Sequence, residues 1–216
     1  MASHRQAIDV WQNALATTPH HLAPKLVYRD PGNDYAVFEY VEGTPLPSHA
    51  GLQPQLLKTL CQAMHRYHQL PLQCAEPAIS YAVRCEHYLD LAASYFDNAK
   101  LEVFTRRYQA LREDSLPHLH FENAALVCCH NDLNRGNILC HNAQENPNSF
   151  MFLDWDFASP GIAAMDFASL GVELGVSSKQ LATIARLSDI QLAAAYRVYA
   201  FFCEIYNEIQ HAAISK

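Results

Sequence analysis

The chain contains, at residues 129–139, the sequence Cys129-His130-Asn131-Asp132-Leu133-Asn134-Arg135-Gly136-Asn137-Ile138-Leu139, and a second polar group, Asp154-Trp155-Asp156, begins 17 residues after Asn137. Short apolar runs at 125–129 and 150–153 come directly before polar residues, a pattern that predicts two buried strands. These strands would present three acceptor side chains near their C-terminal ends: Asp132, Asn137 and Asp154. We therefore expect the three side chains to face one cleft.

These acceptors offer the chemistry of phosphoryl transfer from a nucleotide. Asp132 would orient an attacking hydroxyl group and accept its proton. Asn137 and Asp154 would hold Mg²⁺ against the phosphates, because Mg²⁺ prefers oxygen ligands and two protein ligands leave room for phosphate and water. The five-residue spacing between Asp132 and Asn137 lets one loop present both side chains. His130 would brace that loop rather than react.

The two motifs resemble those of the choline kinase, thiamine kinase and aminoglycoside phosphotransferase group, which shares the protein-kinase-like fold. The pattern H-N-D-L-x-x-x-N-I-L at 130–139 is similar to the catalytic loop of the group, and the strand that ends in D-W-D is similar to its metal-binding strand. The resemblance implies catalytic roles for Asp132 and His130 and metal-binding roles for Asn137 and Asp154. The HND and DW[DE] variants favour choline or thiamine kinases over the antibiotic kinases.

Two further segments resemble elements that surround the active site in this group. The segment Phe38-Glu39-Tyr40-Val41-Glu42-Gly43 looks like the strand and hinge that meet adenine, so the backbone of Glu39, Tyr40 and Val41 would bind the base of ATP. The segment Met165-Asp166-Phe167-Ala168 is similar to the element that buttresses the active site, and we expect Asp166 to be a buried structural acceptor. With these segments, the resemblance extends from about residue 5 to residue 210.

Two polar residues of the motifs keep alternative interpretations. Arg135 would contact a nucleotide phosphate, or it is a solvated surface arginine. Asp156 would contact the metal or the substrate, or its side chain would accept a hydrogen bond that structures the loop. Both residues are candidates for the site.

Outside the motifs, the sequence predicts a small N-terminal piece and a mostly helical remainder. Apolar spacing predicts a helix at 3–16 and helices from residue 52 onward, and β-rich runs at 26–28 and 35–40 predict a hairpin. The expected fold class is α+β and protein-kinase-like, with a truncated small N-lobe of few antiparallel strands. The expected divisions are a partial N-lobe at 1–42, a hinge at 43–51 and a helical C-lobe with the catalytic loop at 52–216.

The segment before the hinge lacks two features with which kinases of this fold hold the ATP phosphates, a Gly-rich loop and a lysine on a following strand. Its only glycine, Gly32, lies in the expected hairpin turn, and its only lysine, Lys25, follows the first helix. That helix has no glutamate to pair with a lysine, and Asp9 is the nearest substitute. We therefore expect a sheet short of strands and slow phosphate transfer by this chain.

Three explanations of this deficit are open. The gene start is misplaced and a real kinase was shortened, or the chain is an intact short kinase that binds phosphate with other groups. The third explanation is a pseudokinase-type protein that binds a metabolite or nucleotide without transfer. The missing strands would leave an open sheet edge and exposed apolar surface, which would favour a homodimer or aggregation.

The acceptor pocket is expected beside the last helix, within 191–208. Aromatic and acidic side chains recur there at helical spacing, namely Tyr199, Glu204, Tyr206 and Glu208. They would bind the cationic group of choline, ethanolamine, thiamine or a similar hydroxylated metabolite through cation–π contacts and charge. The net charge of −7 also suits a cationic acceptor. The alternative is that the aromatic stripe packs in the core.

Composition argues against several other classes of protein. Fifteen Lys and Arg against 22 Asp and Glu give no basic face for nucleic acid. A zinc hydrolase would use Cys128, Cys129, His130, Cys140 and His141, but their spacing matches no zinc motif. Seven cysteines without a disulfide framework, no signal-peptide pattern and no membrane-length apolar run predict a cytoplasmic protein. The expected cofactors are ATP and Mg²⁺.

Overall fold

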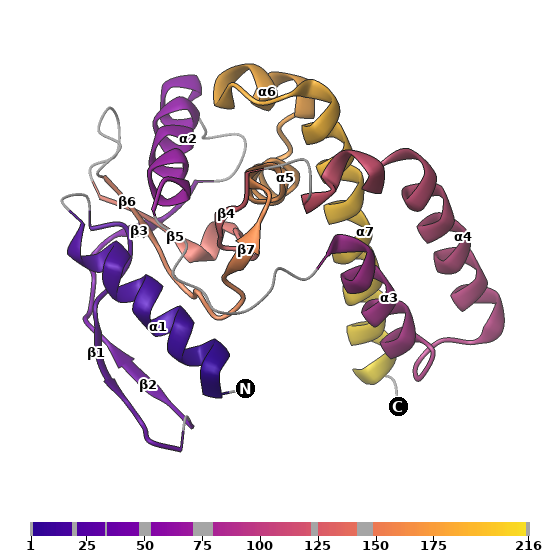
Figure 1. Cartoon of the computed structure of the whole chain (residues 1–216), viewed down its shortest axis with the longest axis horizontal. Helices are drawn as coiled ribbons and strands as arrows, with labels where there is room; N and C mark the ends of the chain where they lie inside the picture. The colour runs from indigo at the N-terminus through magenta and orange to yellow at the C-terminus, as the bar shows by residue number, and fades with distance from the viewer. Residues whose placement is uncertain are drawn as a thin grey trace.

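The structure is a computed structural model that describes residues 2–18, 21–32, 34–47, 53–70, 80–121, 125–141 and 149–214. Figure 1 shows one helix and two strands from the N-terminus at one end of the molecule and a group of helices that includes α3, α4 and α7 at the other. Short strands and the helix α5 lie between them. The architecture is α+β with few antiparallel strands, which confirms the predicted fold class.

The N-terminal part consists of a helix and a two-stranded antiparallel sheet: α1 (Ala2–Thr17), β1 (Leu26–Arg29) and β2 (Ala36–Phe38). In the turn between the strands, the Asp30 carboxylate accepts a hydrogen bond from Gly32 N–H at 2.8 Å. Asn33 of the predicted turn lies outside the described residues. A further bond, from Phe152 N–H to the Leu22 carbonyl at 2.8 Å, joins this part to the centre of the molecule.

Two small antiparallel sheets in the centre carry the motifs. One has the order β3–β5–β6, with β3 (Thr44–Pro45), β5 (Ile138–Cys140) and β6 (Phe150–Phe152). The other pairs β4 (Val127–Cys129) with β7 (Ser159–Gly161). Strands β4 and β6 confirm the buried strands predicted at 125–129 and 150–153.

Strand β3 lies in the hinge, or connector, predicted at 43–51. Its two residues pair with β5. Gly43 permits this approach, because a Cβ at that position would lie 3.1 Å from the Cβ of Leu139. Residues 48–51 of the connector lie outside the described part of the chain.

The C-terminal part is mostly helical, as predicted. Its helices are α2 (Pro54–His68), α3 (Tyr81–Ala92), α4 (Asn98–Asp114), α5 (Ala163–Leu174), α6 (Ser178–Ala185) and α7 (Asp189–Ile214). Helix α7 packs against α3, α5 and α6. The six largest fully buried side chains are aromatic: Tyr67 of α2, Phe150 and Phe152 of β6, Trp155, Phe167 of α5 and Phe201 of α7. Within the described ranges, no helix is long and apolar enough for a membrane crossing.

Candidate active site

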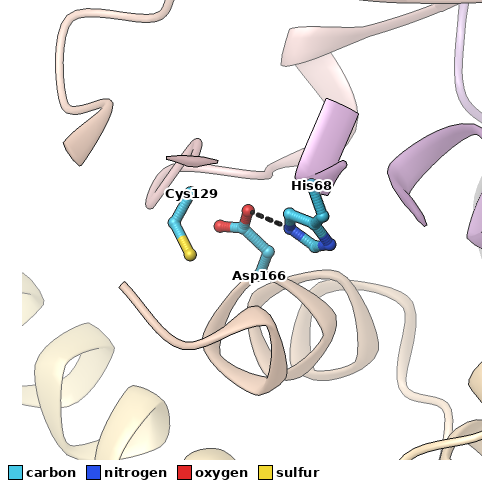
Figure 2. A group of neighbouring side chains, drawn as sticks. All are labelled: His68, Cys129 and Asp166. Atoms are coloured by element: carbon cyan, nitrogen blue, oxygen red, sulfur yellow. Dashed lines mark hydrogen bonds and ion pairs between the residues drawn. The ribbon is translucent and has the colours of Figure 1, made fainter. Parts of the chain in front are cut away.

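The loop between β4 and β5 is anchored by the buried carboxylate of Asp166 on α5. Its Oδ1 accepts a hydrogen bond from Asn131 N–H at 2.8 Å, and its Oδ2 accepts bonds from His130 N–H at 2.9 Å and the Tyr67 hydroxyl at 2.8 Å. His68 Nε2 lies 3.0 Å from the same Oδ2, as Figure 2 shows. Burial opposes ionisation, but the contact with His68 and the bonds from the loop hold the pKa of Asp166 below its ordinary value. Asp166 is thus the buried acceptor that the sequence predicts.

The same buried group has the composition of a metal site without the chemistry of one. Figure 2 shows His68 and Cys129 on either side of Asp166, and their potential ligand atoms lie within 4.8 Å of one another, the one such group among the described residues. The oxygens of Asp166 are already occupied by the loop and by Tyr67. Burial and then the Asp166 charge raise the pKa of the Cys129 thiol well above its ordinary value, so the thiol is protonated in the metal-free chain.

Asn131 shapes the turn at the start of the loop. Its backbone is left-handed, with φ of 64°, a conformation that asparagine tolerates better than most residues. Its side-chain amide donates to Ser159 Oγ and to the Phe157 carbonyl, both at 3.0 Å, and its Oδ1 accepts from Arg84 Nη1 at 3.1 Å. The asparagine of the H-N-D motif therefore ties the loop to α3, to Phe157 and to the first residue of β7.

The side chains of Asp132 and Asn137 lie next to each other. Asn137 Nδ2 donates to the Asp132 carbonyl at 2.9 Å and to the Asp132 carboxylate at 3.1 Å. A 3₁₀ turn, η4 (Arg135–Asn137), makes this possible, and the Asn134 side chain caps it by accepting two backbone N–H bonds. Because the amide nitrogen points to Asp132, the amide oxygen of Asn137 is turned away from that carboxylate.

His130 links the loop to the strand end that carries Asp154. Asp132 N–H donates to His130 Nδ1 at 3.3 Å, so the ring proton is on Nε2, which donates to the Leu153 carbonyl at 2.7 Å. Complete burial lowers the pKa of His130 and keeps the ring neutral. In addition, Leu153 N–H donates to the Asn137 carbonyl at 2.8 Å. These bonds bring Asp154, the residue after Leu153, to the Asp132 loop.

Two cavities border this group of side chains. The smaller has a volume of about 340 Å³, and its lining residues are Arg84, Tyr88, Asn131, Asp132, Phe157, Met165, Tyr199, Phe202, Cys203 and Tyr206. The larger has a volume of about 860 Å³ and lies between the hinge and the strand end of β6. It is lined by the predicted site residues Glu39, Tyr40, Val41, Asp154 and Asp156, together with Gln12, Pro24, Arg29, Asp34, Tyr35, Ala36, Phe38, Gly43, Pro45, Leu139, Leu153 and Trp155.

Five predicted site residues are not among the residues that line either cavity, and one of them, Glu208, pairs with Lys100. His130 and Asn137 support Asp132 through the hydrogen bonds described above. Glu204 is exposed and pairs with Arg107, because it comes five residues after Tyr199 and is turned about 140° around the helix axis from it. Arg135 lies in the η4 turn, and the structure does not bring it to a cavity.

Sequence patterns did not reveal several of the lining residues, among them two arginines and a tyrosine. Arg84 and Tyr88 of α3 line the smaller cavity, and Arg29 of β1 lines the larger one. The i, i+4 spacing of Arg84 and Tyr88 places both on one helix face and was the available signal. Nothing in that spacing shows which neighbour the face meets.

Comparison with known proteins agrees with the geometry. The sequence matches the model of the family described as "Phosphotransferase enzyme family" (APH) over residues 5–202. No curated protein sequence matches the chain.

Solved structures with a similar fold include kinases of small molecules. A choline/ethanolamine kinase family protein from Mesorhizobium loti is 16% identical, with a TM-score of 0.71 over 97% of this chain and 72% of that one. The choline kinase LicA from Streptococcus pneumoniae, also solved with AMP, is 16% identical, with a TM-score of 0.72 over 96% and 72%. The GDP and kanamycin complex of APH(2")-IIia is 16% identical, with a TM-score of 0.68 over 95% and 75%. With the family match over most of its length, the chain belongs to the phosphotransferase enzyme family.

Proposed function

We propose that the chain is an ATP-dependent small-molecule kinase, which transfers the γ-phosphate of ATP to a hydroxyl group of a small metabolite. The observation that carries the proposal is the position of Asp132. It lines the smaller cavity, and its partner Asn137 is bonded to the strand end that leads into the larger cavity. A base in this position would lie between an acceptor and a nucleotide.

In the proposed reaction, Asp132 orients the acceptor hydroxyl and takes its proton. Burial raises the pKa of Asp132, and the charge of Asp154 adds to the rise, whereas His130 and Asn137 oppose it. A carboxylate is a sufficient base, because the loose transition state of phosphoryl transfer requires proton removal only late. The bonds from Asn137 and His130 hold the side chain and backbone of Asp132 in place for this step.

The donor set beside Asp132 fits Mg²⁺. Asn137 offers an amide oxygen and Asp154 a carboxylate, and both are hard oxygen ligands. When bound, Mg²⁺ would neutralise charge on the phosphates. Asn137 would be oriented for this role by its Nδ2 bond to Asp132.

The nucleotide would occupy the larger cavity. The N–H of Glu39 is bonded to the Lys25 carbonyl at 2.9 Å, so adenine would be met by the Glu39 carbonyl and by the backbone of Tyr40 and Val41. The AMP and GDP complexes among the similar structures support a nucleotide as the ligand.

The acceptor would occupy the smaller cavity. Tyr88, Tyr199 and Tyr206 bring aromatic rings to it, and its charged lining residues, among those described, are Asp132 and Arg84, the latter bonded to Asn131. These features suit choline, ethanolamine, thiamine or a similar hydroxylated cation. Glu204 and Glu208 of α7 would not contact the acceptor, because they pair with Arg107 and Lys100 on the surface. The kinases of choline and ethanolamine among the similar structures support this class of acceptor.

A second candidate is a pseudokinase-type protein that binds a nucleotide or metabolite without transfer. It is favoured by the described N-terminal sheet, which has two strands and presents no lysine to the larger cavity. Turnover distinguishes this candidate from a kinase.

The decisive experiment measures ATP consumption by the chain with choline, ethanolamine, thiamine and kanamycin, with and without Mg²⁺. Asp132→Asn should lower kcat by about 10²- to 10⁴-fold, because the hydroxyl loses its base, while the Kd for ATP stays within about twofold. The matched control is Asp114→Asn, which changes an exposed aspartate on α4, away from both cavities.

Turnover that survives Asp132→Asn would contradict the kinase mechanism. ATP binding by the wild-type chain without turnover on any of the four acceptors would instead support the non-catalytic candidate.

A further inference from the structure

A partly buried ion pair joins α1 to β1 beside the larger cavity. Arg29 Nε donates to Asp9 Oδ2 at 2.5 Å, and Arg29 Nη2 donates to Asp9 Oδ1 at 2.6 Å. The two side chains are 14% and 15% exposed. Two parallel hydrogen bonds fix both the position and the plane of a guanidinium group. Asp9 therefore holds Arg29 in one orientation.

The pair leaves part of the guanidinium group available to a ligand. A guanidinium has five N–H donors, and Asp9 takes two, so three remain. Arg29 lines the larger cavity together with Asp154 and Asp156. The charge of Asp156 also raises the pKa of Arg29, after the larger effect of the Asp9 bond. Arg29 thus lines the cavity that contains the predicted metal ligand and has three donors that Asp9 does not use.

The charge balance of this cavity makes Arg29 important. Among the described lining residues it is the one positively charged side chain, whereas Asp34, Glu39, Asp154 and Asp156 are acidic. Such a lining repels a polyphosphate unless cations compensate. Metal ions compensate part of the charge in phosphotransferases, and a fixed side-chain cation held by a carboxylate supplies another part.

Other cations near the hinge are not placed for this contact. Lys25 is exposed and does not line the cavity, and Arg135 lies outside the lining as well. We propose that Arg29 binds the phosphates of the nucleotide and that Asp9 positions it for this contact. The inference rests on the proposed ATP-dependent function. It gives the chain a phosphate-binding cation on β1, although no lysine of the described chain lines the cavity.

The test compares binding of MgATP and of adenosine to the full chain by isothermal titration calorimetry. Arg29→Gln should weaken MgATP binding about tenfold or more, because hydrogen bonds to charged phosphates are lost, and should change adenosine binding less than about twofold. Arg29→Lys should recover part of the MgATP affinity. The matched control is Arg106→Gln, which removes an exposed arginine paired with Glu102 on α4.

A double variant distinguishes the loss of a phosphate contact from misfolding caused by an unpaired charge at Asp9. Asp9→Asn combined with Arg29→Gln keeps two amides that can bond to each other and leaves no unpaired charge. It should show the same selective loss of MgATP affinity. Asp9→Asn alone should also weaken MgATP binding without weakening adenosine binding, because it removes only the group that orients Arg29.

The outcomes separate the Arg29 proposal from the proposed function. Unchanged MgATP affinity in Arg29→Gln and in the double variant would overturn the role of Arg29 alone. So would equal losses for MgATP and adenosine together with a lower melting temperature, the result expected if the pair only ties α1 to β1. A wild-type chain that binds neither ligand would overturn the ATP-dependent function, and the Arg29 proposal with it.

Discussion

Asp166 holds the loop of the candidate site in place, because its fully buried carboxylate accepts hydrogen bonds from the backbone N–H groups of His130 and Asn131. Asp166→Asn would turn an amide N–H₂ toward these donors and leave at least one of them unpaired. We expect the free energy of unfolding to fall by about 3–5 kcal/mol, the usual cost of removing one partner from a buried charged network. Urea unfolding at neutral pH measures the change.

The same carboxylate makes stability depend on pH. Its pKa is lower in the folded chain than in the unfolded chain, so its contribution is complete above the unfolded pKa of about 4 and is lost as the pH falls through the folded pKa. Asp166→Asn should therefore flatten the loss of stability on the acid side. The exposed control Asp114→Asn should keep the slope of the wild type, and an unchanged slope in Asp166→Asn would contradict the anchoring role.

Among single residues, the sequence could predict the roles of those that lie close together in one motif. Asp132, Asn137 and Asp154 lie in short motifs whose chemistry is specific, and the structure brings them to one region. Glu204 was assigned from helical spacing alone, which gives an angle around α7 but not the side that faces the loop. The sequence does not indicate a role for Arg29, because that role depends on a contact with Asp9, which is 20 residues earlier in the chain.

Among the elements, the contact between α5 and α7 is the most restrictive. A Cβ at Gly171 of α5 would lie 1.6 Å from the hydroxyl oxygen of Tyr196 on α7, a separation that no pair of non-bonded atoms can keep. That hydroxyl also donates to the Val176 carbonyl at 2.8 Å. Gly171→Ala should therefore lower the free energy of unfolding by about 1–3 kcal/mol, despite the better helix propensity of alanine. Thermal and urea unfolding measure it.

Removing the opposing hydroxyl should relieve part of the clash. In the double variant with Tyr196→Phe, Gly171→Ala should cost less than it does in the wild-type chain, although the ring carbon would still lie 2.4 Å away. A purely additive result would show that the cost of Gly171→Ala does not come from the Tyr196 hydroxyl.

Elements with strong local patterns were predictable, and elements defined by a distant partner were not. Strands β4 and β6 follow from apolar runs, and α7 follows from a long helical pattern. Strand β3 has two residues and exists through its pairing with β5, where Thr44 meets Cys140, 96 residues later. No local propensity encodes such a contact, and Gly43, which permits it, resembles any connector glycine in the sequence.

At the scale of the whole molecule, the sheet of β1 and β2 exposes an apolar surface. Val27 is 63% exposed, and Tyr28 and Val37, which pair across the two strands, are exposed as well. Because apolar side chains on an open sheet favour association, we predict that the chain dimerises through this surface. Light scattering across a concentration series should show a mass above that of the monomer.

Charged substitutions on the exposed strands test the location of the contact. The double variant Val27→Lys and Val37→Lys should shift the equilibrium toward the monomer, whereas Val103→Lys, on the exposed face of α4, should not. A wild-type chain that stays monomeric at every concentration would contradict the prediction.

The elements that line the smaller cavity determine how the preference for an acceptor can change during evolution. Six of its ten lining residues belong to α3 and α7. Of these six, Arg84 bonds to Asn131 in the loop that carries Asp132, and Asp166 of α5 and Leu153, the residue after β6, also hold this loop. Mutations at Tyr88 or Tyr206 therefore alter the shape of the cavity without touching the bonds that hold Asp132. Substitutions on these two helices can thus change the acceptor during evolution, while the residues that perform the chemical step stay the same.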